Sequence, residues 1–146
     1  MPEPQVELVV SEVRTAVPLR PGQEAGLVVL AERDSPFRVL HIYVGQAEAR
    51  AIQAGLHGIP PARPSTWDLL LSALGLFGAK LEKVVITRVE QQRHFFANLE
   101  LSKDGEPYFL QCRPSDAIAL AVRVEEVTIA STEEVMVAAG QPPDPL

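Results

Sequence analysis

The N-terminal third of the chain has the pattern of short β-strands. Apolar and β-branched residues recur through three runs, which are separated by turns rich in proline, glycine and charged residues. We predict strands at Val6–Val17, Gly26–Glu32 and Phe37–Val44. Because no helical pattern interrupts these runs, the three strands are expected to form a β-meander.

The pattern changes to a helical period after Gln46. Apolar residues then recur three or four positions apart until Gly55 and Gly58 interrupt the run, which predicts a helix. The connector at residues 57–64 contains three prolines and cannot be helical, because the residue before each proline is driven towards extended geometry. A second helix is predicted at Ser65–Phe77, with leucines along one face.

The C-terminal half returns to strands before it ends in helices. Two β-like runs, Leu81–Val89 and Phe95–Leu101, are followed by Asp104-Gly105, a strong hairpin signal that leads into Tyr108–Cys112. Because strands cluster rather than alternate with helices, we predict an α+β fold: a mostly antiparallel mixed sheet of about seven strands packed with about four helices. The remaining predicted elements are a helix at Ser115–Arg123, a strand at Val127–Ala130 and a helix that follows the capping box Ser131–Glu134 and ends at Gly140.

Length and composition predict one domain. The chain has 146 residues, which suits a single domain at residues 5–140 followed by a flexible tail at residues 141–146. The formal net charge of −6 disfavours a broad basic face for nucleic acid. A single cysteine, Cys112, excludes an internal disulfide and a zinc site with four cysteine ligands. We find no signal peptide and no membrane-spanning run, and we expect a soluble cytoplasmic protein.

The tripeptide Arg-Pro-Ser occurs twice, at Arg63–Ser65 and Arg113–Ser115, each time where a predicted helix begins. The proline fixes the start of the helix, the serine can cap it, and the free amides of the first turn favour an anion. An arginine before the cap adds a planar fork of donors that suits phosphate or carboxylate. We therefore predict that folding brings the two arginines together at one anion-binding site.

An acid lies just inside each of these two helices, Asp68 in the first and Asp116 in the second. Such acids can cap the helix, hold a cation or move a proton. Capping alone explains them, since Ser65 and Asp68 have the spacing of a capping box. The pattern leaves both the structural and the chemical interpretation open.

Three ordered segments resemble the signature blocks of the bifunctional nuclease domain family. They are Leu40–Gly45 with the following Glu48, then Arg63–Leu70, then Arg113–Ala121. The resemblance extends over nearly the whole chain and implies an α+β domain, often self-associating, that cuts DNA and RNA with little sequence preference. The residues that match motif positions of the family are Arg63, Thr66, Asp68, Arg113, Ser115 and Asp116.

The sequence departs from the family pattern at two positions. Trp67 stands where the family usually has histidine, and an indole cannot accept a proton. Gln111 stands where the family usually has an acid, and an amide does not replace a carboxylate as a charged ligand. Two functions therefore remain: a nuclease-like hydrolase of phosphodiester bonds, or a non-catalytic oligomeric binding or regulatory module that kept the fold.

In the nuclease hypothesis, each matched residue has an expected role. Arg63 and Arg113 would hold the phosphate, while Asp68 and Asp116 would position water or bind a divalent cation such as Mg²⁺. Nucleic acid would bind transiently, a homo-oligomer is expected and no membrane partner is expected. The residues expected to contact substrate are Ser65, Thr66, Ser115, Trp67, which could stack on a base or pack in the core, and His57 in the connector.

Overall fold

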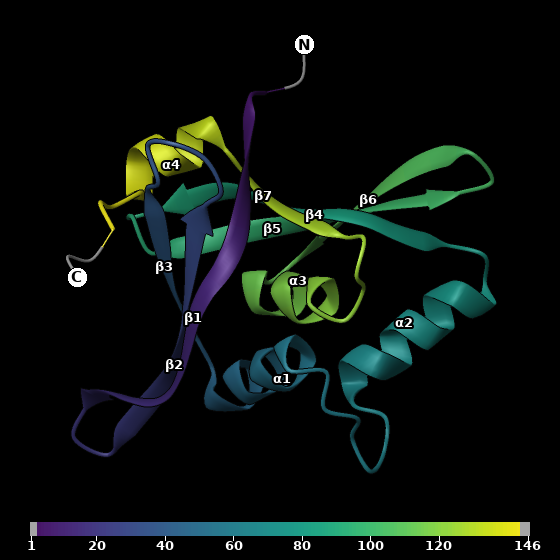
Figure 1. Cartoon of the computed structure of the whole chain (residues 1–146), viewed down its shortest axis with the longest axis horizontal. Coiled ribbons are helices and arrows are strands. Elements are labelled where there is room, and N and C mark those ends of the chain that lie inside the picture. Colours follow the sequence, from purple (N-terminus) through teal and green to yellow (C-terminus); the bar gives the residue numbers. More distant parts are fainter. Residues whose placement is uncertain (1–2, 144–146) are drawn as a thin grey trace.

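The computed structural model describes residues 3–143, and within them seven strands form one mixed sheet in the order β3-β2-β1-β7-β4-β5-β6 (Figure 1). Four helices accompany the sheet in this part of the chain, which confirms the α+β prediction. The strands are β1 (Gln5–Arg20), β2 (Gln23–Glu32), β3 (Val39–Val44), β4 (Lys80–Glu90), β5 (His94–Lys103), β6 (Glu106–Cys112) and β7 (Thr128–Thr132). The helices are α1 (Gln46–Leu56), α2 (Thr66–Leu76), α3 (Pro114–Ala121) and α4 (Glu133–Ala139).

Both hairpin regions that local sequence signals predicted are present in the structure. The first three strands pair as an antiparallel meander, as predicted. Asp104 and Gly105 both have positive φ angles, 51° and 79°, which is the geometry of a two-residue hairpin turn. This turn joins β5 to β6, and β6 is one of the two edge strands of the sheet.

The centre of the sheet is formed by a strand from the end of the chain. Strand β7 lies between β1, with which it is antiparallel, and β4, with which it is parallel. It therefore joins the N-terminal meander to the β4–β5–β6 sheet. Figure 1 shows the meander crossing β4, β5 and β6 steeply, with α1 and α3 on one side of the sheet.

The core lies around α3. Five of its eight residues are apolar and buried, from Ala117 to Ala121, and they belong to the same cluster as the inward residues of β2, β4 and β5. Helix α1 packs beside α3 and against β2, where Gly26 leaves the space: a Cβ atom at Gly26 would collide with Ala49. Helix α3 is therefore held firmly by its surroundings.

Element boundaries differ from the prediction by a few residues at several ends, and two of these differences have a clear physical reason. Strand β1 continues through Pro18 to Arg20. The pairing register with β2 shifts on both sides of Pro18, as at β-bulges, and such irregular pairing accommodates a residue that has no backbone N–H. The last helix is capped by Thr132 and not by Ser131: the Thr132 hydroxyl accepts the backbone N–H of Val135 at 3.2 Å, while Ser131 is buried in β7.

The domain boundary near residue 140 remains a prediction. Gln141 pairs with Val39 on the outer edge of β3, so the first residue of the expected tail contacts the sheet. Residues 144–146 of that tail lie outside the described residues. In the described part of the chain, no helix is long and apolar enough to cross a membrane.

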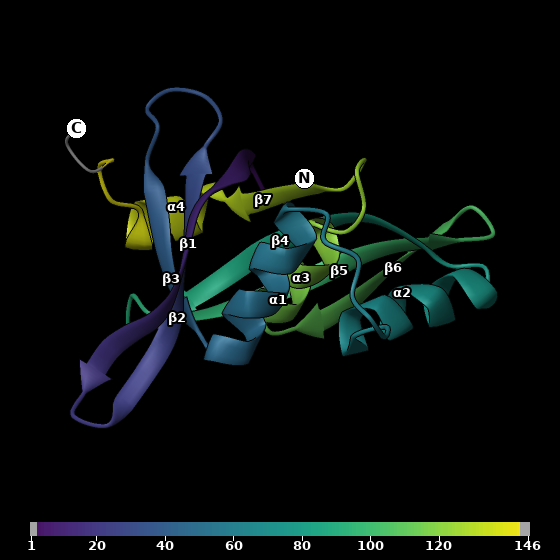
Figure 2. The same ribbon diagram turned by 60° about the horizontal axis from the view of Figure 1, so that its bottom comes forward.

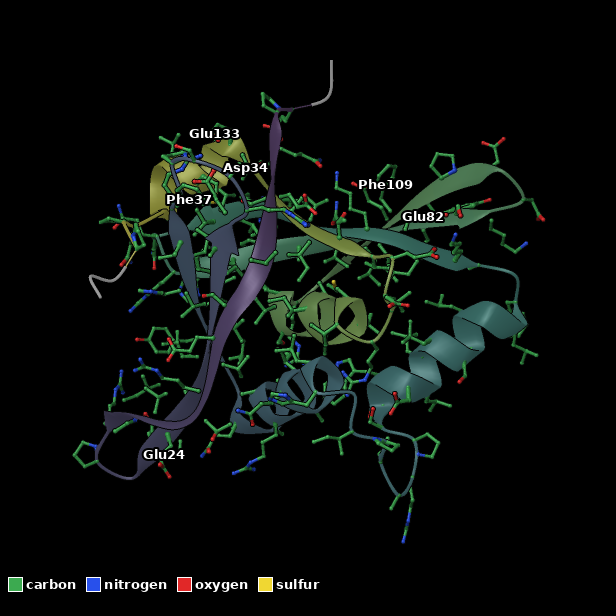
Figure 3. All side chains as sticks on the ribbon, in the orientation of Figure 1. Glu24, Asp34, Phe37, Glu82, Phe109 and Glu133 are labelled. Carbon is green, nitrogen blue, oxygen red and sulfur yellow. The ribbon has the colours of Figure 1, made fainter. Side chains whose placement is uncertain are left out.

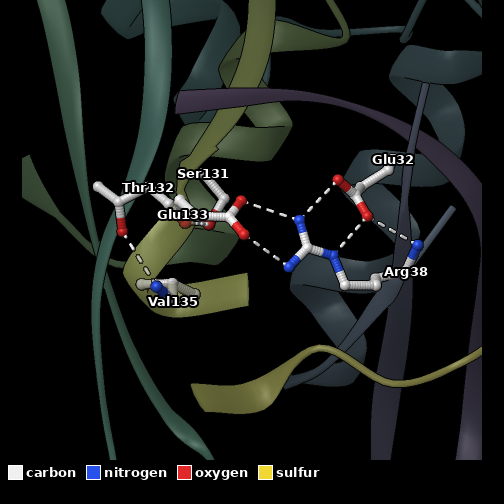
Figure 4. Close-up of polar contacts among 6 residues, drawn as sticks. All are labelled: Glu32, Arg38, Ser131, Thr132, Glu133 and Val135. Carbon is white, nitrogen blue, oxygen red and sulfur yellow. Dashed lines mark hydrogen bonds and ion pairs between the residues drawn. The ribbon is translucent and has the colours of Figure 1, made fainter. Parts of the chain in front are cut away.

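A partly buried ion-pair network joins the meander to α4 (Figure 4). The Arg38 guanidinium donates to Glu32 at 2.7 and 2.9 Å and to Glu133 at 2.8 Å through each terminal nitrogen. The Glu32 side chain is only 4% exposed. Because Glu133 lies 95 residues from Arg38 in sequence, this contact fixes the last helix on the first half of the sheet.

Candidate functional site at the starts of helices α2 and α3

The start of α2 is a complete capping box. Ser65 is the N-cap: its hydroxyl accepts the Asp68 backbone N–H at 3.2 Å, and its own backbone N–H donates to the Asp68 carboxylate at 2.8 Å. The predicted cap at Ser65 is confirmed. The Ser65 hydroxyl also donates to the Asp68 carboxylate at 2.7 Å, and this bond, followed by the one from the Ser65 backbone, holds the pKa of Asp68 below its usual value.

Asp68 also forms an ion pair with an arginine that the sequence analysis did not identify as its partner. Arg123, just after α3, donates from Nε to Asp68 at 3.2 Å and from Nη1 to the Ala119 carbonyl at 2.7 Å. The Arg123 side chain is 11% exposed, so this ion pair lies largely out of solvent. Asp68 therefore fixes the start of α2 against the end of α3.

The start of α3 differs from that of α2, and the prediction that Ser115 caps the helix is wrong. Arg113 is the N-cap residue and Pro114 occupies the first helical position, where its fixed φ and missing N–H are best tolerated. Ser115 therefore lies within the first turn, 5% exposed. The N-cap of α3 provides no side-chain hydrogen bond, so its first turn is not closed off by a capping group.

Arg113 and Asp116 form a bidentate ion pair. The guanidinium donates to the two carboxylate oxygens at 2.9 and 3.0 Å. This bond is the main cause of a raised pKa for Arg113, and the charge of Glu48 adds to it. The Arg113 side chain is still 65% exposed, so Asp116 orients the guanidinium without covering it.

Trp67 connects the two helix starts. It packs against the core cluster, as the packing interpretation expected, and its indole Nε1 donates to Asp116 at 3.2 Å. The Arg123 guanidinium lies 5.8 Å from the ring centroid. Trp67 therefore supplies a hydrogen-bond donor to the Asp116 carboxylate at the position where the family usually has a histidine.

The two Arg-Pro-Ser segments border different cavities. Arg113 and Ser115 line a cavity of about 570 Å³ together with Tyr43, Arg93 and His94. A second cavity of about 770 Å³ is lined by Ser65, Asp68 and Arg123. Arg63 is exposed before α2 and lines neither of these two cavities, so its meeting with Arg113 at one anion-binding site stays a prediction.

The carboxylates do not form a metal centre with their neighbours. Across residues 3–143, no group of three or more His, Cys, Asp or Glu side chains could hold a metal ion. Asp68 and Asp116 each already accept hydrogen bonds from an arginine and from a second donor. The residues present therefore do not fit a protein-built magnesium site, and we derive no step through a cation.

Two further predicted residues lie at the surface. Thr66 is exposed in the first turn of α2, and His57 is exposed at the C-cap of α1.

Cys112 is partly buried against the core, and this burial raises its pKa to about 11, with the Asp116 charge adding to the effect. Cys112 is thus a packing residue with a weakly acidic thiol.

Sequence reasoning missed the residues that reach the α3 cavity from other elements. Arg93 and His94 come from the tight turn between β4 and β5, and Tyr43 comes from β3. The signal for the first two was their position: an exposed basic dipeptide at the end of the three-residue turn of a hairpin. No local signal connects Arg123 with Asp68, since 55 residues separate them.

Comparison with known proteins gives two findings. A family model described as the bifunctional nuclease domain matches residues 28–144. The uncharacterized proteins MT1877 and Rv1829, from the CDC 1551 / Oshkosh and H37Rv strains of Mycobacterium tuberculosis, are each 35% identical to the chain over 113 residues. The aligned segment covers 77% of the chain and 66% of each of these relatives, so the chain spans just under two thirds of their length.

Proposed function

Because the chain belongs to the bifunctional nuclease domain family, we propose that it binds phosphodiester groups of DNA and RNA at the start of α3 and hydrolyses them there with little sequence preference. The observation that carries this proposal is the cavity of about 570 Å³ in which Arg113, Arg93 and His94 surround the first turn of α3. Cationic donors and an imidazole thus border one open space.

Phosphate binding follows from the donors around this cavity. Arg113 offers a planar, exposed guanidinium, and Asp116 keeps it in one orientation. The uncapped first turn of α3 adds the positive end of the helix dipole. Arg93 lines the same cavity from the β4–β5 turn and would share the negative charge. Asp116 acts in this scheme as a positioning residue for Arg113.

Hydrolysis also needs a group that moves a proton. His94 borders the α3 cavity, and histidine is the side chain most often used for general acid–base catalysis. We assign it the role of general base towards the attacking water, in place of the histidine that Trp67 displaces from the family pattern. Asp68 serves α2 as a cap and as the partner of Arg123, while Arg63, Ser65, Thr66 and His57 stay predicted substrate contacts.

The alternative is a binding or regulatory module without catalysis. The observation that favours it is that both aspartate carboxylates already have hydrogen-bond donors. Asp68 and Asp116 each accept hydrogen bonds from an arginine and from a second donor. Neither carboxylate is therefore available for a cation or a proton without losing a structural contact. In this case Arg113 would bind a phosphate group that stays intact.

The test uses the purified full chain with end-labelled single-stranded RNA and duplex DNA, in Mg²⁺, in Mn²⁺ and in EDTA. Arg113→Ala should lower cleavage by about a hundredfold, the usual effect of removing one preorganised donor. His94→Ala should lower cleavage while leaving oligonucleotide binding in place. Arg33→Ala is the matched control, since Arg33 pairs with Glu7 on the exposed surface of the meander and lines no part of the α3 cavity.

The outcomes separate the two functions. Equal cleavage by the parent and by an Arg113→Ala, Asp116→Ala double variant would indicate a contaminating nuclease and end the proposal. Binding that depends on Arg113, without cleavage in any buffer, would establish the non-catalytic alternative. Because the net charge is −6, binding is expected to be weak. Two arginines line the α3 cavity, so the affinity should fall with only about the second power of the salt concentration.

A further inference from the structure

The α3 cavity has a cationic side and an apolar side. Arg113 and Arg93 supply the positive charge, from the start of α3 and from the β4–β5 turn. A phosphate group alone would make no use of the apolar side. The cavity volume of about 570 Å³ lies within the range of roughly 300–1,000 Å³ that is usual for small-molecule sites. The apolar residues that line the cavity include Leu19, Ile42, Tyr43, Val44, Phe95 and Phe96.

One of the aromatic side chains on the apolar side is open to a ligand. Phe95 packs against the core cluster. The ring of Phe96 is covered by Arg88, whose guanidinium carbon lies 4.1 Å from the ring centroid. Tyr43, in contrast, is 56% exposed. The Tyr43 ring is therefore the aromatic surface of this cavity that a ligand can cover.

Tyr43 is held by a strand and not by a loop. It lies on β3 in register with Leu27 of β2, and a side chain on a regular element keeps its position better than one on a loop. Figures 1 and 2 both show the β4–β5 turn beside β3. The turn that carries Arg93 thus lies next to the strand that carries Tyr43, and both residues line the α3 cavity.

The Ser115 hydroxyl is available to a ligand on the cationic side. Ser115 is 5% exposed and lines the cavity. Within residues 3–143 its side chain forms no hydrogen bond. Every fully buried side-chain nitrogen or oxygen in the same residues has a partner, so the Ser115 hydroxyl is open to the cavity. A hydroxyl beside the Arg113 guanidinium suits an anionic oxygen.

The ligand that matches both sides of the cavity carries an anion next to a flat ring. A nucleotide has this composition. In a duplex each base is paired and stacked inside the helix, so it would have to leave the stack before it could reach a protein side chain. An unpaired nucleotide needs no such step. Stacking on an aromatic ring also accepts any base, because every base has a π face.

We propose that the α3 cavity selects an unpaired nucleotide of a DNA or RNA strand, with its base stacked on Tyr43 and its phosphate bound by Arg113 and the Ser115 hydroxyl. This inference rests on the proposed function, because it takes the start of α3 as the phosphate site. Tyr43 positions the nucleotide and determines specificity, and it takes no part in breaking the phosphodiester bond. A duplex meets only the cationic side and gains nothing from Tyr43.

The experiment measures binding of the full chain by fluorescence anisotropy. The probes are a labelled oligothymidylate, an abasic strand of the same length and a duplex of the same length. Tyr43→Ala and Tyr43→Leu should each weaken oligothymidylate binding by roughly five- to 150-fold, the range for losing one stacked base. Both variants should leave binding of the abasic strand and of the duplex unchanged. Tyr43→Phe should bind like the parent, since it keeps the ring.

Two further variants serve as controls. Phe109→Ala removes another exposed aromatic side chain of an edge strand, 63% exposed, and should bind oligothymidylate like the parent. Figure 3 shows Phe109 on the face of the β5–β6 hairpin that is turned away from α2, and it lines no part of the α3 cavity. Ser115→Ala should weaken binding of the oligothymidylate and of the abasic strand alike, because it acts on the phosphate.

The outcomes separate this inference from the proposed function. If Arg113→Ala binds all three probes like the parent, phosphate does not bind at α3 and both fail. If Arg113→Ala weakens binding but Tyr43→Ala and Tyr43→Leu bind oligothymidylate like the parent, the phosphate site stands and stacking on Tyr43 is wrong. Equal binding of oligothymidylate and of the abasic strand by the parent has the same meaning. Competition by free uridine monophosphate at the concentration at which oligothymidylate itself competes would overturn the assignment to a strand.

Discussion

The indole Nε1 of Trp67 donates a hydrogen bond to Asp116 at 3.2 Å, and this bond links the first turns of two helices that are 49 residues apart in sequence. Asp116 in turn orients Arg113, and Arg123 ties the end of α3 back to Asp68 on α2. Each helix thus holds a residue that stabilises the other. The position of Arg113 at the cavity therefore depends on α2, even though no residue of α2 lines that cavity.

The first prediction concerns this link. Trp67→Phe keeps an aromatic ring against the core but removes the N–H donor, so the free energy of unfolding should fall by about 1 kcal/mol or somewhat more, because the acceptor is charged. Urea denaturation followed by circular dichroism measures the change. Trp67→Phe in an Asp116→Asn background should cost less than in the parent, since the bond to the carboxylate is already lost. Equal costs in both backgrounds would show that the bond contributes nothing.

The elements of the fold could be predicted from the sequence because their signals are local. Alternation identified the meander, Asp104-Gly105 identified the β5–β6 turn, and the spacing of Ser65 and Asp68 identified the cap of α2. The position of β7 between β1 and β4 could not be predicted in the same way. It depends on which strands pair across the whole chain, and periodicity carries no such information.

The candidate site was predictable only in part for the same reason. Arg113 and Asp116 are three residues apart, so their ion pair follows from helical spacing. The convergence of Arg63 with Arg113 was inferred from a repeated tripeptide, but a repeat specifies the local start of a helix and not the packing between two helices. The cavity at α3 instead draws Arg93 and His94 from a hairpin turn, through the tertiary fold.

The second prediction concerns the cap of α2. Asp68→Ala removes the capping box and leaves the buried Arg123 guanidinium without its carboxylate, so the free energy of unfolding at neutral pH should fall by about 1–2 kcal/mol. Asp68→Asn should cost less, because asparagine can still take part in the cap. Chemical denaturation of the three proteins measures the order. A similar loss in both variants would assign the effect to the ion pair with Arg123 instead.

The pH dependence of the same variant has a defined sign. The pKa of Asp68 is lowered in the folded chain, first by the hydrogen bond from the Ser65 hydroxyl. Its contribution to stability is therefore complete above the unfolded pKa of about 4 and is lost as the pH falls through the lower folded pKa. The stability difference between the parent and Asp68→Ala should shrink on acidification. A difference that grows as the pH falls would contradict this assignment.

The third prediction concerns the network in Figure 4. Arg38→Met leaves Glu32, whose side chain is 4% exposed, without its guanidinium, and the free energy of unfolding should fall by about 3–5 kcal/mol. The matched control is Arg33→Met, whose exposed pair with Glu7 is expected to contribute less than about 1 kcal/mol. A Glu32→Gln, Arg38→Met double variant should be more stable than Arg38→Met, because no unpaired charge remains buried. Urea denaturation at neutral pH measures all four proteins.

The last prediction uses Cys112 as a reporter of the Asp116 charge. Burial raises the pKa of Cys112 to about 11, and the negative charge of Asp116 is the next largest cause. Because the thiolate is the reactive form, the folded chain at about pH 8 should react with a thiol reagent roughly a hundredfold more slowly than the chain unfolded in urea. Asp116→Asn should accelerate the reaction of the folded chain by removing the nearby charge. Glu24→Gln, at an exposed position of β2, is the control and should leave the rate unchanged. If Asp116→Asn reacts no faster than the parent while its unfolding curve shows a folded chain, the carboxylate does not act on this thiol, and burial alone keeps Cys112 unreactive.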